Sequence, residues 1–559
     1  MARAAHARAI LLLVAVTLLT ALPFVRRAYF VDDHYFLTIA RHLAVHPDRP
    51  YDFRADDELP QTVGWESGHP PRMVNPLLFH YYLAAVIRIF GGATWVLRSS
   101  ALLFSVVAVL AMYFIGFRLT PRPLYAALLF AVTPAFWLTS YSLLIDGAMI
   151  GFFLAALWTF MAGLERRHRG LVLCSGLLMG ATMLTKYSGA LVVILAFAWQ
   201  AMHPAFRRWR FGYAAYAVAA LGVGAWCAWT AHLYGATHLL ASAARGVKAD
   251  EPIVFYLYKL LVVGSFLGGG SLFMVGMPGL LWARSRASLG ALAALFMGLL
   301  AVFTSAHGGF TLAQGAQLAF WFCVAAAFGM GLCIFGWPGE RPRQFLTMWF
   351  CLAALELIVV MPWTAGRYLL VILPPAIWLM DGWMRAAGWG TARRATLALT
   401  AVGAFLIASA DAAQANVLFD LSQRLAGKNC ISQDCYYLGD TFSAYPAYLS
   451  AYGWRAAFPS QTYKAGDVIL VARYRQSSWW RLPDTLKRKL IGTVDYPFAL
   501  PIRVMDVPDG AGWYASCWGP LPFVIANGPL ERFDVFEVVS SAPESASRSV
   551  GSRRGKRTS

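Results

Sequence analysis

The 559-residue sequence predicts an all-α polytopic membrane protein of about thirteen transmembrane helices with a small α/β domain on its outer face. Two observations lead to this fold class. Hydrophobic residues make up 59% of the chain and charged residues only 13%, with a mean hydropathy of +0.55, whereas a soluble domain carries about 25% charged residues. Apolar runs of roughly 17 to 25 residues, the length that crosses a bilayer, recur along most of the chain. A soluble multidomain protein is therefore excluded.

The first apolar run, from Ala9 to Val25, follows Arg3 and Arg8. We interpret it as a membrane anchor rather than a cleaved signal peptide, because no small-x-small cleavage site follows Phe24. Each later run is a candidate span, and the two short runs at 171–185 and 187–203 are interpreted as two crossings. The later runs are 99–117, 124–141, 144–163, 171–185, 187–203, 212–234, 255–282, 289–306, 312–337, 345–363, 366–384 and 395–412.

Basic residues set the topology. The chain holds 47 Lys and Arg against 28 Asp and Glu, a net charge of +19, but arginines concentrate in alternate connections, as in cytoplasmic loops. We therefore expect membrane lipids around the chain and no nucleic acid partner. The pattern predicts a multi-pass plasma membrane protein with a cytoplasmic N-terminus and an outer C-terminus, and the Arg- and Ala-rich composition indicates a bacterial inner membrane. These arginines are Arg118, Arg122, Arg166, Arg167, Arg169, Arg207, Arg208, Arg210, Arg284, Arg286, Arg341, Arg343, Arg385, Arg393 and Arg394.

Three regions follow from this topology. Residues 1–412 form the transmembrane domain, with a large first outer loop at 26–98, and residues 413–540 form an extracytoplasmic α/β domain. Strand-like runs at 467–474, 490–496, 501–507 and 532–539 and a helix at 443–452 predict its elements. The Ser- and Arg-rich tail at 541–559 is expected to be disordered.

Cysteine spacing leaves one question open. Cys430 and Cys435 lie in the outer domain, where disulfides are permitted, and a disulfide and two free thiols are both compatible with the sequence. The sequence holds no Cys/His zinc spacing, no Gly-rich nucleotide loop and no internal repeat, which argues against an ATP-driven transporter.

Charged residues at the ends of the apolar runs form the best candidate site. A charge inside a span costs at least a few kcal/mol, so each is a functional candidate, and charges with unrelated structural roles should scatter between both membrane faces. The topology instead places six of them near the outer leaflet. Two follow the first run, one precedes the second, one opens the fourth, one follows the fifth and one opens the twelfth: Asp32 and Asp33, Arg98, Asp146, Lys186 and Arg367.

This set of side chains fits transfer from a phosphate-linked donor. Carboxylates such as Asp32 and Asp33 can deprotonate an acceptor or hold a divalent metal, and Arg and Lys grip a phosphate. For Asp32 the alternative is a helix cap, and for the cations it is contact with lipid headgroups. Because nucleotide sugars are cytoplasmic, a donor at the outer face is expected to be a lipid-linked phosphate whose polyprenyl tail stays in the bilayer.

Several short motifs in order resemble the glycosyltransferase C superfamily, which includes the protein O-mannosyltransferases and the lipid A aminoarabinose transferase. The first is the acidic pair in VDDHY at 31–35, and the resemblance covers roughly residues 10 to 385. The others are NPLLFHYY at 75–82, FG at 90–91, LR at 97–98, LLID at 143–146, GATMLTKY at 180–187, and GRYLL at 366–370 before Pro374 and Pro375. The sequence departs from the family at Asn75, where members often have Lys, and at Asp33, where many have Glu.

The resemblance implies a glycosyltransferase C type fold and an inverting hexosyl- or pentosyltransferase. It would move a sugar from a polyprenyl phosphate to a hydroxyl of a lipid, glycan or protein, with a divalent metal as the one candidate cofactor. The implied roles are catalysis by Asp32, Asp33 and Asp146, with a metal held by Asp32 and Asp33 as the alternative; donor phosphate binding by Arg98, Lys186 and Arg367; and acceptor binding or a motif role for Asn75, Glu66 and His69.

Two other classes of protein remain open from the sequence. A lipid or solute transporter should place charges near the bilayer midplane on broken helices of repeated halves. A membrane-anchored binding protein would instead use its outer domain, so that residues 428–539 alone would bind the ligand.

Overall fold

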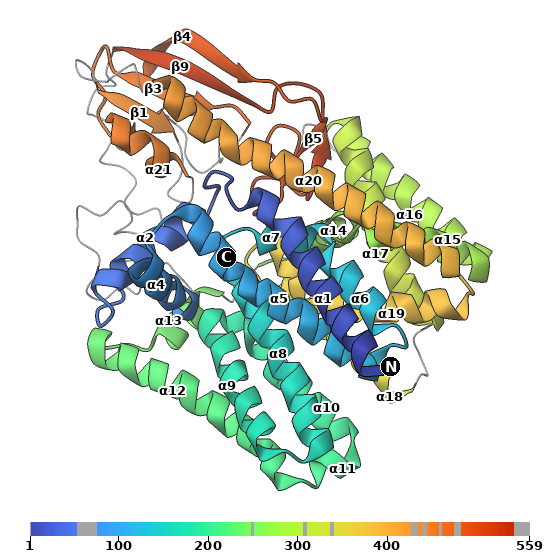
Figure 1. Ribbon diagram of the computed structural model, residues 1–559. Helices are drawn as coiled ribbons and strands as arrows, with labels where there is room; N and C mark the ends of the chain where they lie inside the picture. Colours follow the sequence, from blue (N-terminus) through green and yellow to red (C-terminus); the bar gives the residue numbers. More distant parts are fainter. Residues whose placement is uncertain are drawn as a thin grey trace, which may run out of the picture.

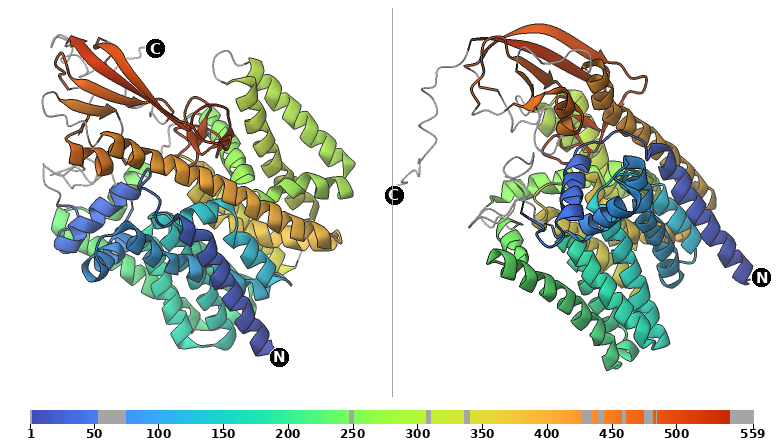
Figure 2. Two further views of the ribbon diagram at one scale, coloured as in Figure 1. Left: turned by 45° about the horizontal axis from the view of Figure 1, so that its top comes forward. Right: turned by 60° about the vertical axis from the view of Figure 1, so that its left-hand side comes forward.

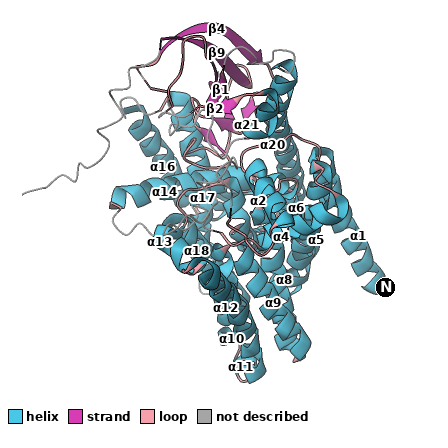
Figure 3. Cartoon of the chain, turned by 90° about the vertical axis from the view of Figure 1, so that its left-hand side faces the viewer, coloured by secondary structure: helices cyan, strands magenta, loops and turns pink. Residues whose placement is uncertain are grey.

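In the computed structural model, placement is described for residues 2–52, 75–246, 251–305, 310–335, 340–425, 434–438, 444–457, 461–474, 482–483 and 485–540. These residues form a helical body and a smaller strand-containing domain at one end of it (Figures 1 and 3). Glu66, His69, Cys430 and the tail 541–559 lie outside the described residues.

Helices at the predicted positions confirm the multi-pass membrane class but not the count of thirteen spans. Nine helices of the described chain are long and apolar enough to cross a membrane, or ten if the pair α6 (Pro123–Ala131) and α7 (Pro134–Ser140), bent by 63°, is one span. The nine lie on α1 (Ala2–Ala21), α5 (Thr94–Leu119), α8 (Ile145–Arg166), α12 (Ala214–Tyr234), α14 (Ile253–Ser271), α16 (Arg286–Ser305), α17 (Leu312–Phe335), α18 (Arg341–Leu355) and α20 (Gly390–Leu425).

The remaining predicted spans are shorter or broken helices. α9 (Arg169–Thr185) and the run formed by η2 (Tyr187–Ala190) and α10 (Leu191–Met202) are apolar helices below the length of a straight span. The predicted run 366–384 is a 3-10 turn, η6 (Gly366–Val371), followed by α19 (Leu373–Ala386). Pro374 and Pro375 cannot donate backbone hydrogen bonds to the preceding turn, so a new helix starts there.

Three helix ends place the predicted charged residues. Asp32 occupies the N-cap position of α2 (Asp33–Val45), Asp146 lies in the first turn of α8, and Lys186 follows the last residue of α9. Arg98 does not precede its span as predicted, because α5 begins at Thr94 and Arg98 lies inside it. The predicted span began at residue 99, because the apolar run alone did not show that the helix begins five residues earlier, at Thr94.

The helical body is centred on α8, which is buried along most of its length and packs against α5 and α9. Gly151 of α8 allows this close approach, since a Cβ atom there would come within 2.8 Å of the Phe104 backbone oxygen of α5. Small residues at helix crossings are typical of membrane proteins.

α20 connects the helical body to the C-terminal domain. Its 36 residues span about 54 Å at about 1.5 Å per residue, longer than the roughly 30 Å hydrocarbon core of a bilayer. The predicted boundary after residue 412 therefore falls inside a continuous helix, whose last turns reach the strand-containing domain (Figure 1). Val417, Leu418 and Leu421 of α20 form a core with Leu470 and Phe533 of the sheet.

The sheet of the C-terminal domain has the strand order β2-β1-β3-β9-β4. β1 pairs in parallel with β2 and β3, and β9 pairs antiparallel with β3 and β4. The predicted strands at 467–474, 490–496 and 532–539 and the helix at 443–452 are confirmed, whereas 501–507 forms two short strands. The elements are β1 (Cys435–Leu438), α21 (Tyr445–Leu449), η7 (Ser450–Tyr452), β2 (Arg455–Ala456), β3 (Val468–Ala472), β4 (Lys487–Tyr496), β5 (Ile502–Arg503), β6 (Met505–Asp506), β7 (Ala511–Gly512), β8 (Val524–Ile525) and β9 (Glu531–Ser540).

The chain between β4 and β9 leaves the sheet and packs on the helical body (Figure 2). We call residues 501–526 the docking segment. The side-chain amide of Gln414 in α20 binds the docking segment through two hydrogen bonds. Nε2 donates to the Met505 carbonyl at 2.7 Å, and Oε1 accepts from the Val504 amide at 3.0 Å. The C-terminal region therefore contributes backbone to the surface above the helices.

Candidate active site

All six predicted outer-leaflet charges form ion pairs, and together with neighbours from distant segments they make up two adjacent networks. We call Asp32, Asp146, Lys186 and Arg367 the first network. The second network contains Arg27, Asp33, Arg98 and Asp411. Asp32 and Asp33 are consecutive residues, so the two networks meet at the start of α2.

In the first network, two carboxylates alternate with two cations. Lys186 Nζ donates to Asp146 Oδ1 at 2.7 Å, and Arg367 Nε lies 3.3 Å from Asp146 Oδ2. Arg367 also donates through Nη2 to Asp32 Oδ2 at 3.0 Å. Residues from the first loop, α8, the end of α9 and η6 thus converge, although more than 300 positions separate Asp32 from Arg367 in sequence.

Asp32 is the most accessible carboxylate of the first network. Its side chain is 14% exposed, compared with 2% for Asp146 and 9% for Arg367. Asp32 occupies an N-cap position, yet its side chain makes no capping hydrogen bond, so the helix-cap interpretation does not account for it. Burial raises the pKa of Asp32 above its ordinary value, while the charge of Arg367 acts in the opposite direction.

Tyr368 adds an aromatic face beside the two cations. Lys186 Nζ lies 3.8 Å from the centre of the Tyr368 ring, and the Arg367 guanidinium carbon lies 5.1 Å from it. Cations are attracted to the face of such a ring. The ring thus helps to hold both cations at one place, where a phosphate can contact both.

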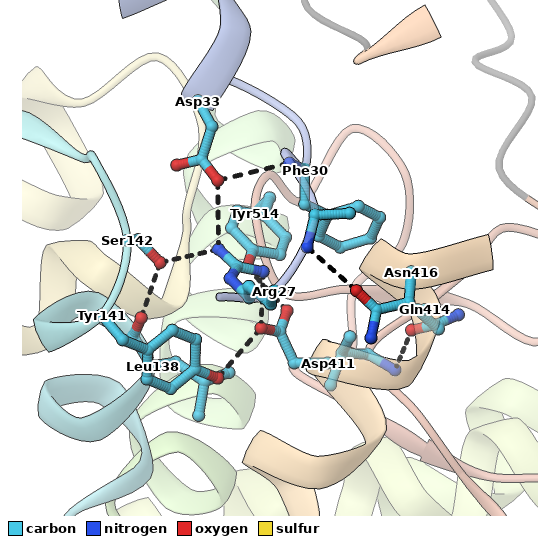
Figure 4. A network of polar contacts seen from close by, with 12 residues as sticks. Arg27, Phe30, Asp33, Leu138, Tyr141, Ser142, Asp411, Gln414, Asn416 and Tyr514 are labelled. Carbon is cyan, nitrogen blue, oxygen red and sulfur yellow. Dashed lines mark hydrogen bonds and ion pairs between the residues drawn. The ribbon is translucent and has the colours of Figure 1, made fainter. Parts of the chain in front are cut away.

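The charged side chains of the second network are buried deeply and pair with one another, and Figure 4 shows the contacts around Arg27. Among the described residues, Arg27 Nε and Arg98 Nε are buried without a hydrogen-bond partner. Arg27 donates to Asp411 at 2.8 Å and to the Ser142 hydroxyl at 2.9 Å, and lies 3.4 Å from Asp33. Asp411 also accepts from Tyr141 at 2.9 Å and from Tyr514 at 2.6 Å. A set of charges paired in this way fixes the segments that carry them.

Arg98 holds the first loop rather than facing a ligand space. Its side chain is 0% exposed and donates to Asp33 Oδ2 at 2.6 Å, to the Ala28 carbonyl at 3.2 Å and to the Arg27 carbonyl. The other Asp33 oxygen accepts from the Leu143 amide at 2.9 Å. These contacts join α5, the first loop and the start of α8.

The same loop holds a strained backbone directly before Asp32. Val31 has φ of +47°, a left-handed conformation that is unfavourable for a β-branched residue. Strain of this kind, about 1–3 kcal/mol, persists where the surrounding structure enforces it and is common at functional sites. Neighbouring side chains hold the residues before Val31. Asp33 accepts from the Phe30 amide at 3.3 Å, and Arg98 donates to the Ala28 carbonyl.

The docking segment completes the first network from the C-terminal domain. Arg367 Nη1 donates to the Tyr514 carbonyl at 2.7 Å, and the Gly366 amide donates to the Trp513 carbonyl at 2.8 Å. The Ser516 amide donates to the Thr364 carbonyl at 2.7 Å. The segment is therefore hydrogen-bonded to residues 364–367 and fixes the guanidinium of Arg367.

Sequence reasoning missed part of this arrangement. The prediction did not include Arg27 and Asp411 of the second network, or Tyr514, which donates to Asp411. Arg27 closely follows the predicted span 9–25 and Asp411 lies at the end of the predicted span 395–412, so both were charges that could have been found. Asn75 lies half-buried before α4 (Leu78–Phe90), and it takes no part in the ion pairs of the two networks. A buried pair between Asp381 and Arg393, at 3.2 Å, lies where α20 begins, far from the sheet. Buried charge is therefore not confined to the end of the helical body that carries the C-terminal domain.

The available ligand atoms do not fit a divalent metal shared by Asp32 and Asp33. The two carboxylates point into different networks, toward Arg367 and toward Arg98. Within the described chain, no group of three or more His, Cys, Asp or Glu side chains is placed to hold a metal ion. One oxygen of each carboxylate, which a shared metal would use as a ligand, instead accepts a hydrogen bond from an arginine.

Residues 74–232 match the family described as dolichyl-phosphate-mannose-protein mannosyltransferase. No curated protein matches the sequence.

Among solved structures, the chain is similar to ArnT from Cupriavidus metallidurans in the apo state, with 15% identity over 87% of this chain and 96% of that chain and a TM-score of 0.41. It is also similar to the apo oligosaccharyltransferase of Archaeoglobus fulgidus, with 16% identity over 82% and 65% of the two chains and a TM-score of 0.46. A third similar structure is the arabinofuranosyltransferase AftD from Mycobacteria, with 14% identity over 95% of this chain and 41% of that chain and a TM-score of 0.39.

The matched segment contains α5, Asp146 and Lys186. The resemblance to the glycosyltransferase C superfamily that the sequence motifs indicate is confirmed, and over residues 74–232 this chain is similar to its dolichyl-phosphate-mannose-protein mannosyltransferase family.

Proposed function

We propose that this protein is an inverting membrane glycosyltransferase that moves a sugar from a polyprenyl phosphate to an acceptor hydroxyl at the outer face. The observation that carries the proposal is the first network, which places an accessible carboxylate beside two cations held at one point. The family match supports a polyprenyl phosphate-linked sugar as the donor.

The chemistry needs one base and one leaving-group site. The acceptor oxygen attacks the anomeric carbon while its proton passes to Asp32, and the bond from the anomeric carbon to the phosphate oxygen breaks with its electron pair. Lys186 and Arg367 stabilise the negative charge that develops on this oxygen. A single displacement of this kind inverts the anomeric configuration.

The other charged residues then act by positioning Asp32, Lys186 and Arg367. Asp146 contacts both Lys186 and Arg367 and so sets their separation. We assign Asp33 and Arg98 to positioning of the first loop, because their contacts are buried protein groups. This changes the roles expected from the sequence, in which Arg98 gripped the phosphate.

We propose that transfer needs no divalent metal, because the carboxylates of Asp32 and Asp33 pair with arginines of two different networks. The matching test is simple. Transfer that persists in EDTA would support metal-free chemistry, whereas transfer that is lost in EDTA and restored by one divalent cation would contradict it.

The orientation is proposed as a cytoplasmic N-terminus and an outer C-terminal domain in a bacterial inner membrane. Cys435 is disulfide-bonded, and disulfides persist in oxidising compartments rather than in the cytoplasm. This supports the outer placement of the domain and of the first network, which lies beneath its docking segment.

The transporter and binding-protein alternatives lack a supporting observation. The charges of the first network lie at helix ends, at the start of α2 and α8 and after α9, and not in the middle of spans. The docking segment contributes to the same site as the helices, so the C-terminal domain is proposed to work together with the helical body.

A transfer assay tests the proposal. Membranes containing the full chain are offered radiolabelled polyprenyl phosphates carrying hexoses or pentoses, with lipid, glycan and protein acceptors present. We expect product from one donor with wild type and none with Asp32→Asn. Asp495→Asn is the matched control, because Asp495 pairs with Arg532 on the surface of the C-terminal domain and should transfer at the wild-type rate. Wild-type turnover by Asp32→Asn would contradict the base assignment.

A further inference from the structure

Arg367 already has an oxygen partner at each of its three nitrogens. Nη2 donates to Asp32, Nη1 donates to the Tyr514 carbonyl, and Nε lies 3.3 Å from Asp146. Its side chain is only 9% exposed. A donor phosphate that uses Arg367 must therefore replace one of these partners.

The charge balance of the first network also requires one partner of Arg367 to leave when a phosphate binds. The first network holds two carboxylates and two cations, so their formal charges cancel. A phosphate diester carries one negative charge and a phosphate monoester more. Adding it to a nearly buried neutral cluster would leave an unpaired charge, which is costly in a poorly solvated site. One carboxylate has to leave when the phosphate enters.

Asp32 is the carboxylate that can leave. Asp146 contacts both cations and is 2% exposed, whereas Asp32 contacts one cation and is 14% exposed. The Tyr514 carbonyl belongs to a segment fixed by further backbone hydrogen bonds. The partner of Arg367 that costs least to release is therefore Asp32.

We propose that Asp32 and the donor phosphate compete for Arg367, so that donor binding itself releases the carboxylate that accepts the proton. This inference rests on the proposed function and extends it to the order of binding. Before the donor arrives, Asp32 is paired with a cation, which makes a carboxylate a weaker base. After the donor arrives, Asp32 is free to face the acceptor hydroxyl. The donor therefore binds before the acceptor is activated.

The proposal makes a prediction that a simple binding role for Asp32 would not make. Asp32→Asn removes the competing charge and keeps the side chain nearly the same size. It should abolish transfer but bind the leaving group more tightly than wild type does. We expect about a tenfold lower Kd, the factor that about 1.4 kcal/mol represents.

The ligand for this test is a polyprenyl monophosphate without sugar, so that no turnover occurs. Its Kd is measured at one pH with the purified full-length protein in lipid nanodiscs, for wild type, Asp32→Asn, Asp32→Glu and Asp33→Asn. Asp32→Glu keeps the competing charge and should bind like wild type. Asp33→Asn removes a neighbouring charge that does not contact Arg367 and should show no comparable tightening. Thermal unfolding identifies any variant that fails to fold, in which case the comparison of Asp32→Asn with Asp32→Glu decides.

The outcomes separate the two ideas. Tighter binding by Asp32→Asn alone supports the competition. Equal or weaker binding overturns it, even if transfer is lost as proposed above. Tighter binding together with wild-type transfer would support the competition and overturn the base assignment. Absence of saturable binding by wild type and variants alike would overturn the proposed function, and the competition with it.

Discussion

The backbone carbonyl of Tyr514 accepts a 2.7 Å hydrogen bond from Arg367, although the two residues lie 147 positions apart. One comes from the C-terminal domain and the other from the 3-10 turn before α19. Through this contact the docking segment fixes a cation of the first network, and the hydroxyl of Tyr514 at the same time donates to Asp411 of the second network at 2.6 Å. The C-terminal domain is thereby part of the candidate active site.

The first prediction concerns Tyr514→Phe. The change removes a hydrogen bond to a buried carboxylate, which costs about 1–3 kcal/mol when the acceptor stays buried. We expect a lower unfolding temperature and a higher KM for the donor, since the segment that fixes Arg367 loosens. Tyr452→Phe is the control, because its hydroxyl makes no hydrogen bond that the structure gives among the described residues. An equal effect of both substitutions would contradict the role of Tyr514.

Asp33→Asn and Asp32→Asn should differ although the residues are neighbours. Removing the charge of Asp33 leaves Arg27 and Arg98 buried with a weaker partner, and breaking a buried pair costs about 3–5 kcal/mol. Asp32 is partly exposed, so its substitution should cost less stability and more activity. Unfolding temperatures and transfer rates of both variants in the same membranes check this. Similar unfolding temperatures would argue against a structural role for Asp33.

Lys186→Met tests the phosphate site. The variant keeps an unbranched side chain only one atom shorter but removes the charge that pairs with Asp146 at 2.7 Å. We expect the KM for the donor to rise by about tenfold or more, the factor that about 1.4 kcal/mol of lost contact represents. Lys186→Arg should restore part of the donor affinity, because the charge returns in a different shape. Donor KM values that do not differ among the three proteins would exclude a contact with the phosphate.

The pH dependence follows from Asp32. Burial raises the pKa of Asp32, and a base must be ionised to accept a proton, so transfer should fall as the pH drops through this pKa. The acidic limb of the kcat/KM profile should therefore lie above about 4, near which a carboxyl in water titrates. Initial rates between pH 4 and pH 8 check this, with Asp32→Glu expected to shift the limb. A flat profile over this range would contradict the assignment of Asp32 as the base.

The orientation can be tested by labelling. Lys489→Cys lies on the exposed edge strand β4, and Arg167→Cys lies on the exposed turn between α8 and α9. In intact cells, a membrane-impermeant maleimide should label the first well above the wild-type background and the second only after the cells are opened. The reverse pattern would invert the proposed topology.

The sequence by itself determined the membrane class, the positions of most long apolar helices and most strands of the C-terminal domain, but not the helices α2 and α4 of the first loop. Apolar runs report burial in lipid directly, since each residue contributes independently of its distant neighbours. Family motifs also pointed to Asp32, Asp146, Lys186 and Arg367, which the structure brings together.

Only the tertiary structure decided how the charges pair. Adjacent residues such as Asp32 and Asp33 look alike in sequence, yet one faces Arg367 near the surface and the other is buried against Arg98. Their different surroundings come from segments hundreds of positions away, including Asp411 and Tyr514. The function of an ionisable side chain depends on its partners and its solvation, and both are properties of the packed chain rather than of the local sequence.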